Sequence, residues 1–250
     1  MERRNVRRGD GTISASWEIK KHADILIGIL HTWNIHPDWA LGMLRMQKAP
    51  FGHRTSIAYR WEHDKPYDLS RNQLAKELLD SGVEWLLFID SDIIPPPNGL
   101  ERLLENKLPI VGGLYWRRHP NVFAEIFKFR PGTTQLDPIP NEQIGPSLNE
   151  VDGIGCGFLL IHRRVFEDLK DKVKKLTIPS EGTNYECYEF FKFAATEPPF
   201  VSEDLYFCIA ARLAGWKIYC DATVRCQHII SSMVVKEGRP EWSPLERGHD

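Results

Sequence analysis

Two short, wholly apolar segments constrain the fold of this 250-residue chain more than any other feature. Residues 25–30 read Ile-Leu-Ile-Gly-Ile-Leu, and residues 85–89 read Trp-Leu-Leu-Phe-Ile. Apolar runs of this length without polar alternation are typical of parallel β-strands that are covered on both faces. They are far shorter than the roughly 18 residues needed to cross a bilayer. We therefore expect a central sheet between helices, and no transmembrane segment.

Helical patterns separate these segments from one another and from later strands. One helix is led by Pro37, and a second is predicted where Ser70 and Gln73 form a capping box, with Gly82 as its stop. Two more are predicted after residues 95–97 and over residues 204–213. Further strands are predicted over residues 55–61, 109–115, 122–129 and 157–161, with two short ones in 216–228. This order predicts an α/β sandwich with a mixed, mostly parallel central sheet.

Charge and cysteine content exclude several classes of protein. The chain has 32 Lys and Arg against 34 Asp and Glu, a net charge of −2, so no overall field draws it to nucleic acid or an anionic membrane. The five cysteines form no C-x-x-C pair, which argues against a disulfide framework and a zinc ribbon. The basic N-terminus lacks the apolar stretch of a secretory signal, so we expect a cytoplasmic protein. We expect a basic tail over residues 1–22, one domain over 23–230 and a C-terminal tail over 231–250.

The segment Asp90-Ser91-Asp92 follows the second apolar run, at the strand end where open α/β sheets place their ligands. Residues two apart in an extended segment project to the same side, so both carboxylates can face one divalent cation. Mg²⁺ or Mn²⁺ commonly bridges such carboxylates to the phosphates of a substrate. The alternative is structural, because acidic residues also favour the start of the helix that follows.

Three further groups have both a functional and a structural interpretation. Gly153, Gly155 and Gly157 alternate, so they could let a sugar approach the backbone, or they could mark a β-bulge. Trp116 and Arg117, followed by Arg118 and His119, could line an acceptor site or be solvated surface. The aromatic residues of the stretch 179–199 could form a lid or a small core; they are Tyr185, Tyr188, Phe190, Phe191 and Phe193.

Three motifs in order resemble a known family. They are Phe88-Ile-Asp-Ser-Asp92, Gly153-Ile-Gly-Cys-Gly-Phe-Leu-Leu-Ile161 with Arg164-Val-Phe166, and Ser202-Glu-Asp-Leu-Tyr-Phe-Cys208 with Ala211-Arg-x-x-Gly215. Together they resemble the family-two-like glycosyltransferases of the GT-A fold, over about residues 23 to 230. The resemblance implies a Rossmann-like sandwich and a metal-dependent hexosyltransferase-like activity (EC 2.4). The sugar would pass from a nucleotide-diphosphate-sugar to a hydroxyl of a saccharide, lipid, protein or modified nucleic acid.

The resemblance also implies roles for individual residues. Asp90, Asp92 and His228 match the positions that hold Mn²⁺ or Mg²⁺, although a lone strand-end His is often only hydrogen-bonded. Asp204, or less favourably Glu203, matches the general base of inverting members, although Ser202-Glu-Asp is also an ordinary helix start. The residues expected at the nucleotide and the donor sugar are His31, Thr32, Arg71, Asn72, Asp90, Ser91, Gly155 and Gly157.

Two other functions remain open on sequence alone. A haloacid-dehalogenase-like phosphatase or phosphotransferase would use Asp90 as its nucleophile, because Phe88-Ile-Asp-Ser-Asp-Ile also looks like that strand-end motif. That motif normally ends the first strand, whereas here at least one strand and two helical stretches precede it. The other is a non-catalytic nucleotide-sugar-binding protein on the same scaffold, since a fold does not guarantee chemistry.

Overall fold

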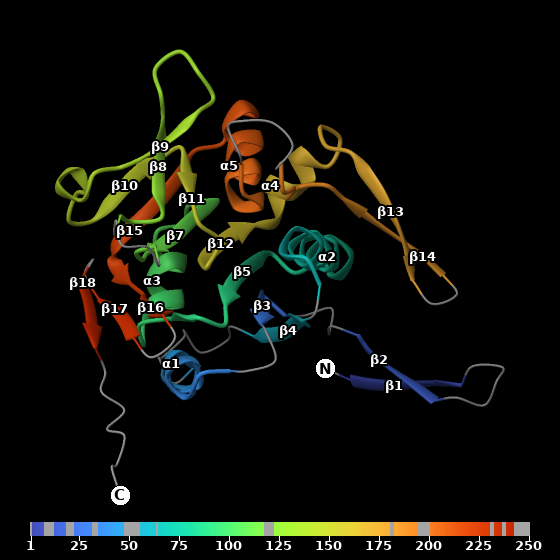
Figure 1. The fold of residues 1–250 in the computed structure, drawn as a ribbon. Coiled ribbons are helices and arrows are strands. Elements are labelled where there is room, and N and C mark those ends of the chain that lie inside the picture. Colours follow the sequence, from blue (N-terminus) through green and yellow to red (C-terminus); the bar gives the residue numbers. More distant parts are fainter. Residues whose placement is uncertain are drawn as a thin grey trace, which may run out of the picture.

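The structure is a computed structural model, and it describes residues 2–7, 13–18, 23–31, 35–47, 56–63, 65–117, 123–180, 183–194, 201–230, 233–236 and 239–242. Within these residues a seven-stranded sheet forms the centre of the molecule (Figure 1). Its strands, in spatial order, are β10 (Leu148–Val151), β15 (Ile218–Arg225), β7 (Ile110–Leu114), β12 (Phe158–His162), β5 (Trp85–Asp90), β3 (Ile25–His31) and β4 (Ile57–His63). All of them run in one direction except β10 and β12. The predicted α/β sandwich with a mixed, mostly parallel sheet is confirmed.

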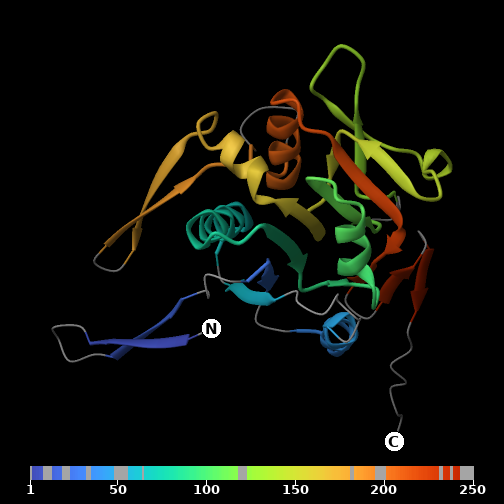
Figure 2. The same ribbon diagram turned by 180° about the vertical axis from the view of Figure 1, so that it is seen from behind.

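Helices cover both faces of this sheet (Figures 1 and 2). One face carries α1 (Pro37–Gln47) and α3 (Gly99–Glu105), and the other carries α2 (Tyr67–Ser81), α4 (Arg163–Leu169) and α5 (Glu203–Leu213). Strand β3 shows why both faces need cover. Its Ile25, Ile27 and Ile29 pack on the α1 side, whereas Leu26 and Leu30 pack on the α2 side. The continuous apolar run is therefore buried on two sides, as its composition predicts.

Shorter strands surround the central sheet. One small sheet joins β11 (Gly153–Ile154), β8 (Ile126–Phe129) and β9 (Leu136–Pro138). The 3₁₀ turn η1 (Asn141–Gln143) follows β9 in the chain. Another joins β6 (Ile93–Ile94), β16 (Gln227–Ile230), β17 (Met233–Lys236) and β18 (Arg239–Trp242), so pairing continues beyond residue 230. Two antiparallel pairs are β1 (Glu2–Arg7) with β2 (Ile13–Glu18) and β13 (Lys175–Ser180) with β14 (Thr183–Tyr188). The first pair lies in the segment predicted to be a basic tail.

Two local predictions are wrong. Helix α2 begins at Tyr67 after Pro66, and Ser70 is buried inside the helix, so Ser70 and Gln73 form no capping box. A break at Asp221 and Ala222 is expected to divide residues 216–228 into two short strands. Residues 218–225 instead form one strand, and the irregularity is a register shift against β7 between Asp221 and Arg225. For the aromatic stretch 179–199 the sequence leaves a lid and a small core open, and the structure shows core packing for the two central residues. They are core residues: Phe190 and Phe191 are 0% exposed and pack against Phe166, with Phe207 stacked on Phe191.

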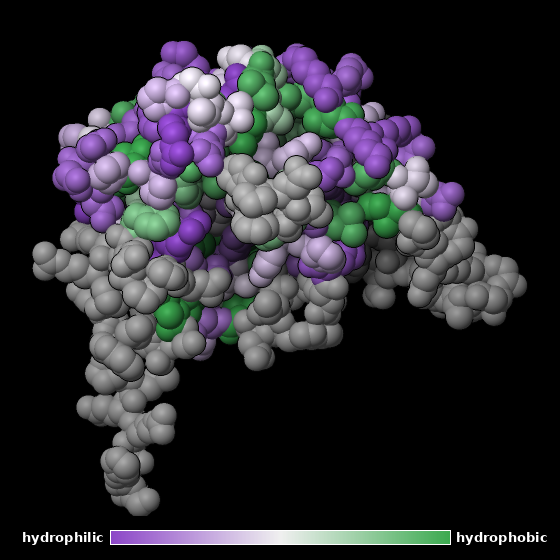
Figure 3. All heavy atoms as spheres, turned by 45° about the horizontal axis from the view of Figure 1, so that its top comes forward, coloured by the Kyte–Doolittle hydropathy of each residue, from purple (hydrophilic) through white to green (hydrophobic). Residues whose placement is uncertain are grey.

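The surface is polar where Figure 3 shows it. The coloured part of that face is mostly hydrophilic, with separate hydrophobic patches rather than a continuous apolar band. In the described ranges, none of the helices combines the length and the apolar character needed to span a membrane.

The end of α2 gives a direct test of the fold. Gly82 stops the helix in the left-handed region at φ 76°, and a Cβ built there meets no atom within 4 Å. Gly82→Ala should therefore lower the free energy of unfolding through backbone strain alone, by about 1–2 kcal/mol. Urea denaturation measures this loss. Gly82→Asn is the matched control and should lose less, because Asn tolerates the left-handed region; equal stability of the Ala variant and the wild type would contradict the assignment.

Candidate active site

A small polar cavity lies at the carboxyl ends of β3 and β5, where open α/β sheets bind ligands. Its volume is about 150 Å³, and its lining residues are Leu30, Tyr67, Arg71, Asp90, Ser91, Asp92, Glu203 and Asp204. Six of these eight are predicted site residues that lie far apart in the sequence. Tyr67 and Leu30 were not predicted, since one begins α2 and the other belongs to an ordinary apolar run.

Arg71 is the buried centre of this cavity, with only 3% of its surface exposed. Its Nη2 donates to both carboxylate oxygens of Asp90, at 3.0 and 3.1 Å, and its Nε donates to Oε1 of Glu203 at 3.2 Å. Its Nη1 is also buried, yet it has no hydrogen-bond partner in the described part of the chain. A buried donor without a partner is costly, so this atom is suited to an acceptor group on a ligand.

The charges of Arg71, Asp90 and Glu203 affect one another's pKa values. Although burial disfavours its charge, the carboxylates of Asp90 and Glu203 raise the pKa of Arg71 well above its ordinary value, so it stays protonated. Burial raises the pKa of Asp90, with Arg71 opposing this shift and Asp92 adding to it. Burial likewise raises the pKa of Glu203, again against Arg71. Four carboxylates line the cavity, from Asp90, Asp92, Glu203 and Asp204, against the single guanidinium group of Arg71. This excess of negative charge favours the approach of a cation.

His228 approaches Asp92 from a different part of the chain. Strand β16 pairs with β6, which directly follows Asp92, and this brings the two side chains together. Nδ1 of His228 lies 2.7 Å from the carbonyl oxygen of Trp116, so Nδ1 must carry the proton. In the neutral ring the lone pair is then on Nε2, which lies 3.8 Å from Oδ2 of Asp92. Such a bond to the other ring nitrogen is the usual way that a ligating His is oriented.

A carboxylate and an imidazole nitrogen so placed fit a divalent metal ion. Within the described residues, no group of three or more His, Cys, Asp or Glu side chains is arranged to hold a metal. Two protein ligands are nevertheless enough where substrate phosphates and water complete the coordination, as is common for Mg²⁺. Asp90 is the poorer ligand of the predicted three, because Arg71 already binds both of its oxygens.

Tyr115, which was not predicted as a site residue, packs against the ring of His228. Its hydroxyl oxygen accepts a hydrogen bond from the backbone N–H of Gly157 at 3.0 Å, and its ring lies edge-on to His228 with centroids 5.7 Å apart. A Cβ on Gly155 would lie 2.1 Å from that hydroxyl oxygen, and a Cβ on Gly157 would lie 2.9 Å from it. The alternating glycines therefore leave room for Tyr115. The only sequence signal for this residue is an aromatic side chain at the end of a Gly-Gly strand.

Asp204 is both a helix-start residue and a cavity residue. It lies in the first turn of α5 and lines the cavity. Its Oδ1 accepts hydrogen bonds from the hydroxyl of Ser202 and from the backbone N–H of Leu205. The two interpretations that the sequence leaves open are thus compatible, because one oxygen can stabilise the turn while the other faces the cavity.

The other predicted residues do not line the cavity. Asn72 is buried, and its amide donates to the carbonyl of Phe191 and accepts from the N–H of Phe191, both at 2.8 Å. Trp116 is buried and donates to Asn141, while the exposed Arg117 forms an ion pair with Glu125 at 2.7 Å. The remaining residues, Thr32, Arg118, His119 and the side chain of His31, lie outside the described part of the chain.

Comparison with known proteins shows similarity in structure only. No protein-family model matches the sequence, and no curated protein matches it. Among solved structures, A197 from STIV superposes with a TM-score of 0.55 at 15% identity, over 90% of this chain and 99% of that chain, so the two share a fold. Apo UDP-glucose pyrophosphorylase and the same enzyme complexed with UDP-glucose superpose with TM-scores of 0.38 and 0.39 at 8% identity. They cover 80% of this chain and 74% and 73% of theirs, a likeness too loose to support an argument about function.

The contact between Gly155 and Tyr115 can be tested by a double-mutant cycle. Gly155→Ala should lower the free energy of unfolding by about 1–3 kcal/mol, because its methyl group overlaps the Tyr115 hydroxyl. Tyr115→Phe removes that hydroxyl, so Gly155→Ala should lower the free energy of unfolding by less in the Tyr115→Phe background than in the wild type. Urea denaturation of the wild type and the three variants measures the coupling. Strictly additive losses would show that the glycine does not make room for Tyr115.

Proposed function

We propose that this protein is a metal-dependent glycosyltransferase of the GT-A kind, which moves a sugar from a nucleotide-diphosphate-sugar to an acceptor hydroxyl. One observation carries the proposal: His228 and Asp92 converge with a defined His tautomer, and Asp92 lines the same cavity as Asp204. A metal-binding pair beside a second carboxylate is what transfer from a diphosphate to a hydroxyl requires. The structural similarity to A197 supports the fold that this function requires, but it does not bear on the chemistry.

The cavity suits the diphosphate end of a donor. At about 150 Å³ it is smaller than the 300–1,000 Å³ of typical ligand pockets, so it would hold the metal-bound phosphates rather than a whole nucleotide-sugar. The nucleoside would then extend along the ends of β3 and β4, and β3 ends at His31, a residue expected at the nucleotide. The unpartnered Nη1 of Arg71 supplies a charged donor for one of the donor's oxygens.

Asp92 and His228 would hold the metal. When bound, Mn²⁺ or Mg²⁺ would neutralise the negative charge that develops on the departing diphosphate. The tautomer of His228 keeps its Nε2 available for this role. An imidazole ligand favours Mn²⁺ over Mg²⁺, which prefers all-oxygen coordination.

Asp204 would accept the proton of the attacking hydroxyl. Both hydrogen bonds described for its carboxylate involve Oδ1, so Oδ2 can face the acceptor. Glu203 is less suited to this role, because it is buried and held by Arg71. A base on the acceptor side gives direct displacement, so we propose inversion at the anomeric carbon.

The phosphatase alternative has weaker support. A nucleophilic Asp90 needs a free lone pair aimed at phosphorus, whereas Arg71 donates to both of its oxygens. The same contacts suit Asp90 to a supporting role beside the donor.

The metal assignment predicts a specific loss of donor binding. A panel of UDP-, GDP- and dTDP-sugars, each with Mn²⁺ and with a chelator, should contain a donor that raises the melting temperature of the wild type only with metal. Asp92→Asn should lose this stabilisation, since the metal loses its carboxylate. Asp137→Asn is the matched control, because Asp137 pairs with Arg130 on the exposed surface and should leave the response unchanged. Stabilisation that is equal with chelator would contradict the metal role.

If Asp204 is the base, replacing it should reduce turnover without reducing donor binding. Asp204→Asn should lower kcat for the donor so identified by about 10²–10⁴-fold, while metal-dependent stabilisation by that donor persists. Steady-state kinetics and thermal shift measure the two effects on one sample. If the wild type instead hydrolyses an aryl phosphate with Mg²⁺, and Asp90→Asn abolishes this, the phosphatase function replaces the one proposed here.

A further inference from the structure

Strand β4 forms the edge of the central sheet. All seven of its residues, Ile57–His63, pair with β3, and no strand pairing or backbone hydrogen bond to its outer edge is found among the described residues. Edge strands normally carry protection against pairing with another chain, such as proline, a bulge or a short length. The described part of β4 has none of these: it is regular, it has no proline, and its register with β3 is continuous. Charged side chains are another such protection, but its Arg60 and Glu62 form ion pairs within the chain.

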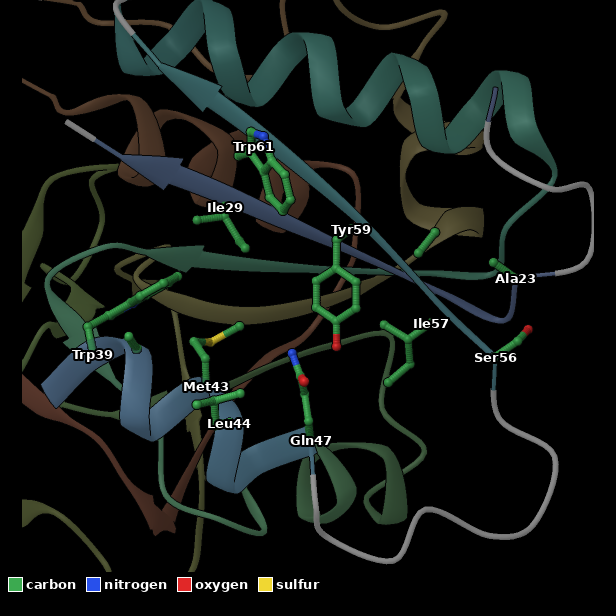
Figure 4. A pocket seen from close by; sticks show the side chains of 12 residues that line it. Ala23, Ile29, Trp39, Met43, Leu44, Gln47, Ser56, Ile57, Tyr59 and Trp61 are labelled. Atoms are coloured by element: carbon green, nitrogen blue, oxygen red, sulfur yellow. The ribbon is translucent and has the colours of Figure 1, made fainter. Parts of the chain in front are cut away.

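The face of β4 toward α1 is apolar and open. Ile57, Tyr59 and Trp61 project from it into a groove of about 790 Å³, whose other wall includes Met43 and Leu44 of α1 (Figure 4). Trp61 is 60% exposed, and Leu44 is 54% exposed. An exposed cluster of large apolar side chains at the edge of a sheet is unusual for a surface that faces only water.

The opposite face of β4 carries two charges of opposite sign. Arg60 forms an ion pair with Glu77 of α2 at 2.7 Å, and Glu62 forms one with Lys65 at 2.7 Å. Arg60 and Glu62 lie one residue on either side of Trp61. An antiparallel pairing of two identical strands about Trp61 therefore sets each Arg60 opposite a Glu62 of the other copy.

We propose that β4 is a self-association surface, at which two copies of this chain pair antiparallel about a two-fold axis with Trp61 opposite Trp61. Such a two-fold interface needs a self-complementary strand, and the charges decide its register. Pairing centred on Arg60 or on Glu62 would set like charges opposite each other, which is destabilising. Pairing centred on Tyr59 would set Arg60 opposite Ala58 and Glu62 opposite Ser56, so the charges would contribute nothing to it. Pairing centred on Trp61 sets unlike charges opposite on one face and large aromatic side chains together on the other. The two central sheets then form one continuous sheet.

Sedimentation velocity of the full chain tests this surface. The wild type should sediment as a species of twice the chain mass of 28.9 kDa at micromolar concentration. Trp61→Lys should sediment as a monomer. Leu213→Lys is the matched control, because Leu213 is 72% exposed on α5 and should leave the dimer intact. Circular dichroism confirms that each variant is folded. A wild type that is monomeric throughout, or a dimer that Trp61→Lys leaves unchanged, would overturn the proposal.

Cysteine cross-linking tests the register independently of affinity. Opposite residues at the two-fold axis of an antiparallel pair are close enough for a disulfide, so Trp61→Cys should form a covalent dimer under mild oxidation. Tyr59→Cys is the matched control on the same face. The two introduced cysteines would then lie four residues apart along the joined strands, so it should not cross-link. The natural cysteines are all buried, which keeps the background low. Equal cross-linking of the two variants, or cross-linking of Tyr59→Cys alone, would overturn the register.

Discussion

The buried guanidinium of Arg71 is the interaction on which the candidate site depends. It joins α2 to the end of β5, the next element of the chain, through Asp90, and to the start of α5, 132 positions further along, through Glu203. Without this charge, the buried Glu203 and the half-buried Asp90 would lose the opposite charge beside them, which is more costly than breaking an exposed ion pair. The position of the cavity, and the spacing of its carboxylates, therefore follow from one side chain in the second turn of α2.

The two sides of the cavity have different chemistry because strands supply one side and a helix supplies the other. On the side of β5 and β6, Asp92 meets His228, whose ring is oriented by a backbone carbonyl and packed against Tyr115. On the side of α5, Asp204 occupies a helix start, where backbone N–H groups favour a negative charge. In the proposed transfer, the side with Asp92 and His228 would hold the cation, and the side with Asp204 would accept the proton.

Much of the fold can be predicted from the sequence, because unbroken apolar strands and glycine or proline boundaries are local signals. The run from Trp85 and the stop at Gly82 are examples. The start of α2 could not be placed this way, because Ser70 resembles a cap in sequence while Pro66 begins the helix one turn earlier. Site residues next to a motif, such as Asp92, were also predictable. Tyr115 was not, since its role depends on a contact with Gly155, 40 positions further along the chain, which no local pattern records.

Neighbouring positions of α2 serve two different parts of the molecule. Arg71 faces the cavity, while the next residue, Asn72, holds the backbone of Phe191 with both ends of its amide. Each side chain is committed to fixed partners, so the helix can neither rotate nor slide along its axis without breaking one set. An insertion or deletion just before α2 therefore cannot be absorbed by the helix itself. Length variation among relatives of this chain should be confined to the connections that precede Pro66 or follow Gly82, with the segment between them constant in length.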